Sequence, residues 1–288
     1  MSLPPNDSAS YRGRLAPSPT GYLHLGHART FWMAQERART AGGALLLRVE
    51  DIDRDRCKSE FAAAMIEDLR WFGFQWREGP DIGGEFGPYL QSQRTEHYLR
   101  ALETLRRSNR VYPCSCTRKD LRLAAQAPHP EDDEPIYPGT CRPNRSSQAS
   151  GIPLSTELHR LNWRFQVNDG EVVSFHDGGF GLQRFEAGKD FGDFLVWRHD
   201  GVPSYQLAVV VDDAAMRITE VVRGADLLRS TARQLLLYRA LGIEPPQYFH
   251  CPLLTDGGGK RISKRDGADS LRALRSKGAT PESLRQQF

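Results

Sequence analysis

Two histidines three residues apart, His24 and His27, lie among glycines in the stretch GYLHLGHART. A short strand, an irregular loop and the start of a helix are expected around them. Anions commonly bind in such places, because free backbone N–H groups and the helix dipole point at the ligand. Imidazole N–H groups can also donate to oxygens that gain charge during phosphoryl attack. A structural histidine pair is the competing interpretation, and a metal site is disfavoured because no third ligand stands at a familiar spacing.

A second candidate for phosphate chemistry is the stretch GGGKRISKRDG, residues 257–267. Its glycines predict a mobile loop, and Lys260, Arg261, Lys264 and Arg265 place four cations on it. Such a loop could close over a triphosphate and neutralise charge on a leaving pyrophosphate. Taken alone, such a stretch is more often a solvated basic loop.

Three of the five cysteines, Cys114, Cys116 and Cys141, cluster in the chain. Without an export signal, reduced thiols and a metal are favoured over disulfides. Three thiolates prefer Zn²⁺, whose structural sites have four ligands. The residues leave the fourth ligand open between His129, Tyr137 and water, and a metal-free group of reduced cysteines remains an alternative.

Opposite charges are expected at the ends of two neighbouring strands, because Arg14 lies at the end of the first and Glu50 at the end of the second. Parallel sheets bind ligands at the carboxyl ends of their strands. A substrate with carboxylates and an ammonium group would need both charges. The alternative is that Arg14 and Glu50 simply pair with each other across the strands.

Alternating apolar and amphipathic segments predict the elements that position these groups. Strand, helix, strand, helix and helix in the first 110 residues favour a doubly wound, Rossmann-like α/β fold with a parallel sheet. The expected elements are a strand over residues 12–15, a helix from His27 to Thr40, a strand over 44–51, a helix that Ser59 caps, and a helix over 92–108.

The second half of the chain changes character after Tyr112. Residues 127–155 are rich in proline, serine and acidic residues, which predicts an irregular segment. A hairpin turning at Asn168–Gly170, a buried strand over 204–214 and a helix over 230–242 follow. The expected organisation is one α/β domain in two halves, 1–110 and 196–245, a cysteine-bearing insertion at 111–195, and the basic loop with a short helical extension at 246–288.

Composition limits the cellular setting. The 288-residue chain has a net charge of only +3, which neither requires nor excludes a nucleic-acid partner. Its sequence has no apolar run of the roughly 20 residues that a membrane helix needs, and its start lacks an apolar signal core. A cytoplasmic protein with no membrane partner is therefore expected.

The two phosphate motifs together resemble a known family. HLGH and RISKR are similar to the HIGH and KMSKS signatures of class I aminoacyl-tRNA synthetases, in that order along the chain. Further stretches resemble the glutamyl branch, among them RLAPSPTGYLHLGHART, LLRVEDIDRDR and VVRGADLLRSTARQ. The second signature departs from its name at Arg261 and Arg265 but keeps Lys264.

The resemblance implies an ATP-dependent ligase that forms an aminoacyl-adenylate, with Mg²⁺ accompanying ATP. It assigns catalysis and ATP contact to His24, His27 and Lys264, with Gly26 also at the ATP. Short glutamyl relatives carry a Cys-x-Cys, Tyr-x-x-x-Cys zinc pattern, so the implied structural Zn²⁺ ligands are Cys114, Cys116, Tyr137 and Cys141. The implied glutamate contacts are Arg14, Ala16, Ser18, Glu50 (for the amino group), Tyr205 and Arg223, although Tyr205 could instead be a core residue.

Only 23 residues follow Arg265, too few for a separate anticodon-binding region. The short chain therefore resembles the glutamyl-queuosine tRNA(Asp) synthetase family, whose members activate glutamate without tRNA and transfer it to queuosine in the anticodon of tRNA(Asp). The implied partners are ATP, L-glutamate and queuosine-containing tRNA(Asp), and the protein is expected to be a monomer. The alternatives are a truncated or split glutamyl-tRNA synthetase that charges a tRNA 3′ end, and a non-catalytic module that binds glutamate and ATP or RNA.

Overall fold

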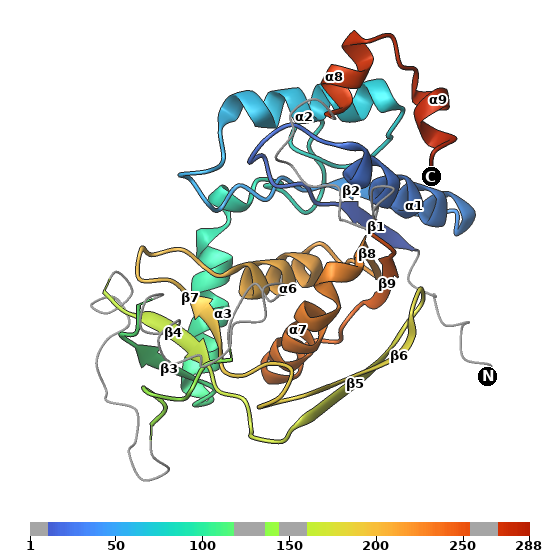
Figure 1. The fold of residues 1–288 in the computed structure, drawn as a ribbon. Coiled ribbons are helices and arrows are strands. Elements are labelled where there is room, and N and C mark those ends of the chain that lie inside the picture. The colour runs from blue at the N-terminus through green and yellow to red at the C-terminus, as the bar shows by residue number, and fades with distance from the viewer. Residues whose placement is uncertain (1–10, 118–135, 144–159, 254–269) are drawn as a thin grey trace, which may run out of the picture.

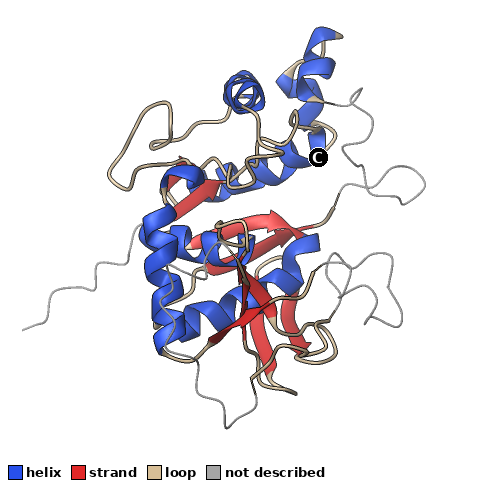
Figure 2. Cartoon of the chain, turned by 90° about the vertical axis from the view of Figure 1, so that its left-hand side faces the viewer, coloured by secondary structure: helices blue, strands red, loops and turns tan. Residues whose placement is uncertain are grey.

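The computed structural model describes residues 11–117, 136–143, 160–253 and 270–288, which contain both helices and strands (Figure 1). In chain order the elements are β1 (Arg12–Leu15), α1 (Leu25–Thr40), β2 (Ala44–Leu47), α2 (Ser59–Phe72), the 3-10 helix η1 (Gln91–Gln93), α3 (Thr95–Arg107), β3 (Val111–Cys114), β4 (Asn162–Phe165), β5 (Val172–Asp177), β6 (Gly181–Glu186), β7 (Phe194–Trp197), α6 (Tyr205–Ala215), β8 (Glu220–Gly224), the 3-10 helix η2 (Ala225–Leu227), α7 (Leu228–Leu241), β9 (Gln247–Cys251), α8 (Leu271–Ser276) and α9 (Pro281–Arg285). Helices pack beside and above the strands, whereas the β5–β6 hairpin lies at the edge of the molecule (Figure 1 and Figure 2).

Two β–α–β units form the centre of the fold. Strands β1 and β2 run parallel and are joined through α1, and β8 and β9 run parallel and are joined through α7. The backbone N–H of Thr219 donates to the carbonyl oxygen of Arg12 at 2.9 Å and links the two units. Parallel strands connected by helices confirm the predicted Rossmann-like α/β class. The strand expected over 44–51 is shorter and ends at Leu47.

The C-terminal helices pack against the first unit. Leu271 of α8 and Leu284 of α9 are buried in the same apolar cluster as Phe72 at the end of α2. In Figure 1 these helices lie beside α1 and α2, at the far end of the chain. Directly before α8, Ser270 forms an isolated antiparallel bridge with His24. The last described segment therefore helps to hold the histidine loop in place.

The predicted hairpin at residues 168–170 is wrong. The turn itself forms, because Glu171 N–H donates to the Asn168 carbonyl at 3.0 Å and Gly170 takes a φ of +73°. Its flanking strands, however, enter different sheets. Strand β4 lies between β3 and β7 in an antiparallel sheet, whereas β5 forms a hairpin with β6 and also pairs with β9. Both flanks are apolar enough for either partner, so local sequence does not select one.

The buried strand expected over residues 204–214 is also wrong, since this segment is α6. Residues Leu207 to Asp213 are all buried, so this part of the helix has no solvent-exposed face. A short helical segment that is buried on every side has no amphipathic period to separate it from a buried strand, and its three consecutive valines favour the strand prediction. The Ser204 hydroxyl, which accepts from Leu207 N–H at 3.4 Å, caps the helix.

Helix ends agree with the sequence in part. Gly242 ends α7 with a φ of +68°, as predicted. Ser59 is not a cap, because Lys58 occupies that position without a side-chain hydrogen bond and Ser59 is the first helical residue. The helix expected over 92–108 is α3, preceded by η1. Across the described ranges, every helix is too short or too polar to cross a bilayer.

Candidate active site

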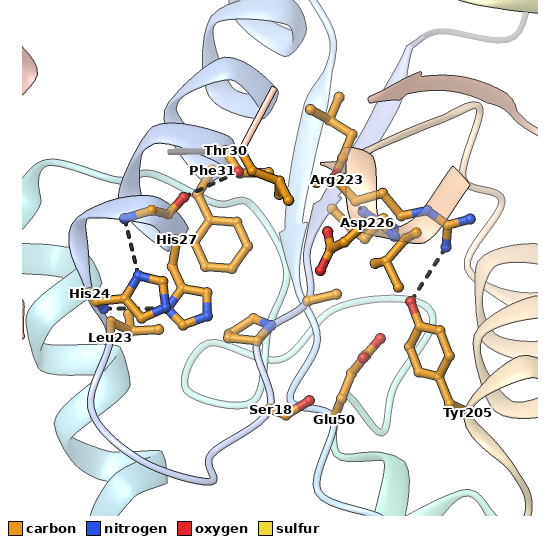
Figure 3. A pocket seen from close by; sticks show the side chains of 18 of the residues that line it. Ser18, Leu23, His24, His27, Thr30, Phe31, Glu50, Tyr205, Arg223 and Asp226 are labelled. Carbon is orange, nitrogen blue, oxygen red and sulfur yellow. Dashed lines mark hydrogen bonds between the residues drawn. The ribbon is translucent and has the colours of Figure 1, made fainter. Parts of the chain in front are cut away.

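One cavity of about 360 Å³ collects the residues that the sequence singled out. Figure 3 shows the histidines on one side and Glu50, Tyr205 and Arg223 on the other. Lys264 and the rest of its loop lie outside the described residues. The cavity-lining residues that were expected from the sequence are Arg14, Ala16, Ser18, His24, Gly26, His27, Glu50, Tyr205 and Arg223.

His24 and His27 cap the start of α1 and stack on each other. The Gly26 N–H donates to His24 Nδ1 at 3.1 Å, and the His24 N–H donates to His27 Nδ1 at 3.3 Å. Their ring centroids are 3.7 Å apart. Because both Nδ1 atoms accept, neutral rings carry their protons on Nε2. A Cβ on Gly26 would lie 2.9 Å from the His24 ring, so the glycine lets the imidazole fold over the helix start.

This geometry corrects one expectation about the helix start. The sequence predicts that free backbone N–H groups would face an anion. Instead, Gly26 N–H is engaged by the His24 ring, and His27 N–H donates to the His24 carbonyl at 3.0 Å. The candidate donors to a phosphate at this end are therefore the imidazole rings rather than these backbone amides. Their tautomer is set by the same hydrogen bonds that cap the helix.

Arg14 and Glu50 belong to a buried charge network and do not pair directly. Arg48, which is fully buried, donates to Asp213 at 2.6 Å and to Glu50 at 3.0 Å. Arg14 donates to the same Asp213 oxygen at 3.3 Å and to the Val222 carbonyl at 3.1 Å. The alternative of a cross-strand Arg14–Glu50 pair is therefore wrong. Instead, Asp213 accepts from Arg14 and Arg48 donates to Glu50, so buried partners fix both cavity side chains.

The network also sets the protonation of its carboxyl groups. Burial raises the pKa of Glu50, although the charges of Arg48 and Arg14 oppose the change. Burial acts on Asp213 in the same direction, but there the Arg48 and Arg14 charges outweigh it and lower the pKa. Asp213 is therefore a fixed anion between two arginines. Glu50, with one direct arginine partner, is the carboxylate that a cationic group in the cavity would stabilise.

Arg223 and Tyr205 line the side of the cavity that faces the two histidines (Figure 3). Tyr205 begins α6 and keeps 39% of its surface exposed, so its alternative interpretation as a core residue is wrong. Arg223 lies on β8, is buried, and donates to the Tyr205 hydroxyl at 3.4 Å (Figure 3). Ala16 and the exposed Ser18 line the floor on the loop after β1.

Among the residues that line the cavity, two with polar side chains were missed from the sequence. Thr30 stands three residues after His27 on α1, so helical periodicity alone could have placed it on the same face. Asp226 follows Arg223 within the stretch RGAD and lines the cavity at η2. A carboxylate three residues beyond a site arginine is a weaker signal, because many such residues only cap helices.

The cysteine cluster forms a second site, in and beside β3. The sulfur atoms of Cys114, Cys116 and Cys141 lie within 4.8 Å of one another, which fits the donor set of a metal site. The Tyr137 hydroxyl lies 3.5 Å from Cys114 Sγ and 3.6 Å from Cys116 Sγ. Tyr137 is thus placed beside the thiols as expected from its spacing, whereas His129 lies outside the described residues.

Protonation within the cluster favours metal binding. Burial opposes ionisation of Cys141, but hydrogen bonds from Tyr137 and from the Ser115 backbone lower its pKa to about 6. Burial raises the pKa of Cys116 to about 11, so without a metal this thiol stays protonated near neutral pH. The Cys141 thiolate beside the Cys116 thiol and the Tyr137 phenol can bind a cation with release of the remaining protons.

Residues 10–288 match the family described as tRNA synthetases class I (E and Q), catalytic domain. The chain is 53% identical to the Glutamyl-Q tRNA(Asp) synthetase of Nitratidesulfovibrio vulgaris, over 93% of this chain and 82% of that protein. It is 50% identical to the protein of the same name from Symbiobacterium thermophilum, over 94% and 83% of the two chains.

A solved structure gives the same result for the fold. The glutamate tRNA ligase from Elizabethkingia meningosepticum superposes with a TM-score of 0.76 at 32% identity, and the match covers 90% of this chain and 52% of that one. The sequence and structure comparisons agree on the glutamyl branch. This chain belongs to the class I tRNA synthetase family of the glutamyl and glutaminyl type, within its glutamyl-Q tRNA(Asp) synthetase group.

Proposed function

We propose that this protein activates L-glutamate with ATP and transfers the glutamyl group to queuosine in tRNA(Asp). The observation that carries the proposal is the single cavity that joins a histidine pair to a buried set of opposite charges. The identity of the acceptor is supported by the relatives at 50% and 53% identity, both named Glutamyl-Q tRNA(Asp) synthetase. A glutamate–tRNA ligase of Syntrophus aciditrophicus is less similar, at 44%.

The charged side of the cavity suits a dicarboxylic amino acid. Glu50 would accept the ammonium group, because its carboxylate is buried and has one direct arginine partner. Arg14, Arg223 and the Tyr205 hydroxyl would bind carboxylate oxygens, with Ala16 and Ser18 along the floor. Bidentate arginine contacts would select for carboxylates over neutral side chains.

The histidine side suits the phosphates of ATP. In the proposed reaction the α-carboxylate of glutamate attacks the α-phosphorus in line, pyrophosphate leaves, and a hydroxyl of queuosine then displaces AMP from the mixed anhydride. His24 and His27 would donate from Nε2 to phosphate oxygens that gain charge, with Gly26 allowing close approach. Lys264 would neutralise the leaving pyrophosphate. Mg²⁺ bound with ATP would reduce the charge on the phosphates.

The acceptor is tested by incubating the protein with labelled glutamate, ATP and two bulk tRNA preparations, one from cells that make queuosine and one from cells that do not. Labelling of the queuosine-containing pool alone is expected. Equal labelling of both pools would instead indicate charging of a 3′ end, as in a glutamate–tRNA ligase. Glutamate-dependent ATP–pyrophosphate exchange without any tRNA is expected in the same preparation and tests activation separately.

The cysteine cluster is proposed to hold one structural Zn²⁺ through Cys114, Cys116, Cys141 and Tyr137. Bound there, Zn²⁺ would cross-link β3 to the segment that carries Tyr137 and Cys141. Cys116→Ser is expected to lower both zinc content, measured by atomic emission, and the melting temperature.

The half-buried Cys57, outside the cluster, supplies the matched control, since Cys57→Ser should retain the metal. Tyr137→Phe and His129→Ala separate the two candidates for the fourth ligand. Retention of zinc by Tyr137→Phe and its loss from His129→Ala would overturn the assignment of Tyr137.

A further inference from the structure

Within the part of the chain that the structure describes, the guanidinium of Arg223 has only neutral hydrogen-bond partners. It donates through Nε to His250 Nε2 at 3.1 Å, and through its two terminal nitrogens to Thr231 Oγ1 at 2.7 Å and to the Tyr205 hydroxyl at 3.4 Å. Among the described residues, no carboxylate forms an ion pair with it. A buried arginine without a direct counter-ion is costly unless its charge serves a ligand.

His250 fixes the Nε side of this guanidinium from behind the cavity. It lies on β9 with no exposed surface, and its Nδ1 is 2.6 Å from an oxygen of the buried Asp177. Burial and then the Arg223 charge lower the pKa of His250 to about 4, so the ring is neutral. With Nδ1–H donating to the carboxylate, Nε2 carries the lone pair that accepts from Arg223.

Asp177 is itself held rigidly at the end of β5. Its Oδ1 accepts from the N–H groups of Gly179 and Phe180, both at 2.9 Å. A Cβ on Gly179 would lie 2.1 Å from the His250 carbonyl oxygen, so the turn passes directly against β9. The β5–β6 hairpin therefore connects to the cavity through three side chains in series, Asp177, His250 and Arg223.

We propose that His250, oriented by Asp177, is a positioning residue that directs the guanidinium of Arg223 at the carboxylate of glutamate. A carboxylate in place of His250 would also fix Arg223, but it would neutralise the charge that the substrate needs. The neutral ring fixes the geometry and leaves that charge for the ligand. This inference rests on the proposed glutamate activation and adds the residue that prepares its arginine.

Two amide substitutions at His250 test the roles of the two ring nitrogens separately. His250→Gln places an amide oxygen near the Nε2 position and keeps an acceptor for Arg223. His250→Asn keeps a polar group near Nδ1 but has no atom that reaches Arg223. In glutamate-dependent ATP–pyrophosphate exchange, His250→Asn is expected to raise the KM for glutamate about tenfold or more, with kcat and the KM for ATP within about twofold of wild type. His250→Gln should recover most of the loss.

The matched control is His176→Asn, because His176 is exposed on β5 next to Asp177 and points away from the core. Equal glutamate KM values for the Asn and Gln variants would overturn the proposal. So would a fall in kcat without a change in KM, which indicates a general structural role. Circular dichroism of each variant verifies that it is folded.

A measurement on the wild type keeps the two proposals distinguishable. Nitrogen-15 NMR of the His250 ring is expected to show the neutral Nδ1–H tautomer at neutral pH without any substrate. An Nε2–H tautomer or a protonated ring would overturn the positioning role, whether or not the variants fold. Absence of glutamate-dependent exchange in the wild type, with the Nδ1–H tautomer present, would instead reject the proposed substrate.

Discussion

Replacing Arg48 with methionine is expected to lower the free energy of unfolding by about 3–5 kcal/mol. Arg48 is fully buried and hydrogen-bonds to two buried carboxylates, Asp213 at 2.6 Å and Glu50 at 3.0 Å, and its Nε lies 3.9 Å from a third, that of Asp212. Methionine fills much of the same volume, so the loss would come mainly from uncompensated charge rather than from a cavity. Denaturant unfolding followed by circular dichroism measures the change.

The loss of unfolding free energy in Arg48→Met should depend on pH. Burial already raises the pKa of Glu50 in the presence of Arg48, and removal of Arg48 would raise it further. A carboxyl whose pKa is higher in the folded than in the unfolded state disfavours folding as pH rises through the folded-state pKa. The difference between Arg48→Met and wild type is therefore expected to shrink as pH falls through the raised folded-state pKa of Glu50 in the variant.

Arg107→Met is the matched control for Arg48. Its side chain is 77% exposed and pairs with Glu103 at 2.9 Å on α3. Exposed pairs of this kind contribute little, so the midpoint should not move. If Arg48→Met were as stable as this control at pH 8, Glu50 and Asp213 would not depend on Arg48 for their charge.

The site was more predictable from the sequence than the path of the chain. Arg14, His24, His27, Glu50 and Arg223 are polar residues at the ends of elements, and the α/β topology brings such ends to one edge of a sheet. Local sequence patterns alone therefore predict that these side chains lie near one another in the fold.

Partners that depend on tertiary packing were not predictable in this way. Arg48 lies inside an apolar run. The strand pattern shows that this position is charged but does not indicate which residues would pair with it. His250 is 27 positions from Arg223 in the chain, yet the parallel register of β8 and β9 sets the two opposite each other. The same limit explains the wrong strand at α6, since a fully buried segment loses the periodicity that separates helix from strand.

His24→Asn and His27→Asn are each expected to reduce kcat for ATP–pyrophosphate exchange by about 10²–10³-fold while leaving the KM for glutamate near its wild-type value. An asparagine amide oxygen can take the place of Nδ1, so it can still accept the backbone N–H that each ring now engages. It lacks the Nε2–H, the group proposed to reach the phosphate. The substitution thus separates the cap of α1 from the chemistry.

His24→Ala completes the comparison, because it removes the cap and the donor together. This variant should lose the rate in the same way and also about 1 kcal/mol of stability. If His24→Asn kept wild-type kcat while His24→Ala lost stability, the His24 ring would serve the helix alone. Loss of rate at unchanged melting temperature in both asparagine variants would place the charge stabilisation on the imidazole donors, because their Nδ1 atoms are committed to the backbone.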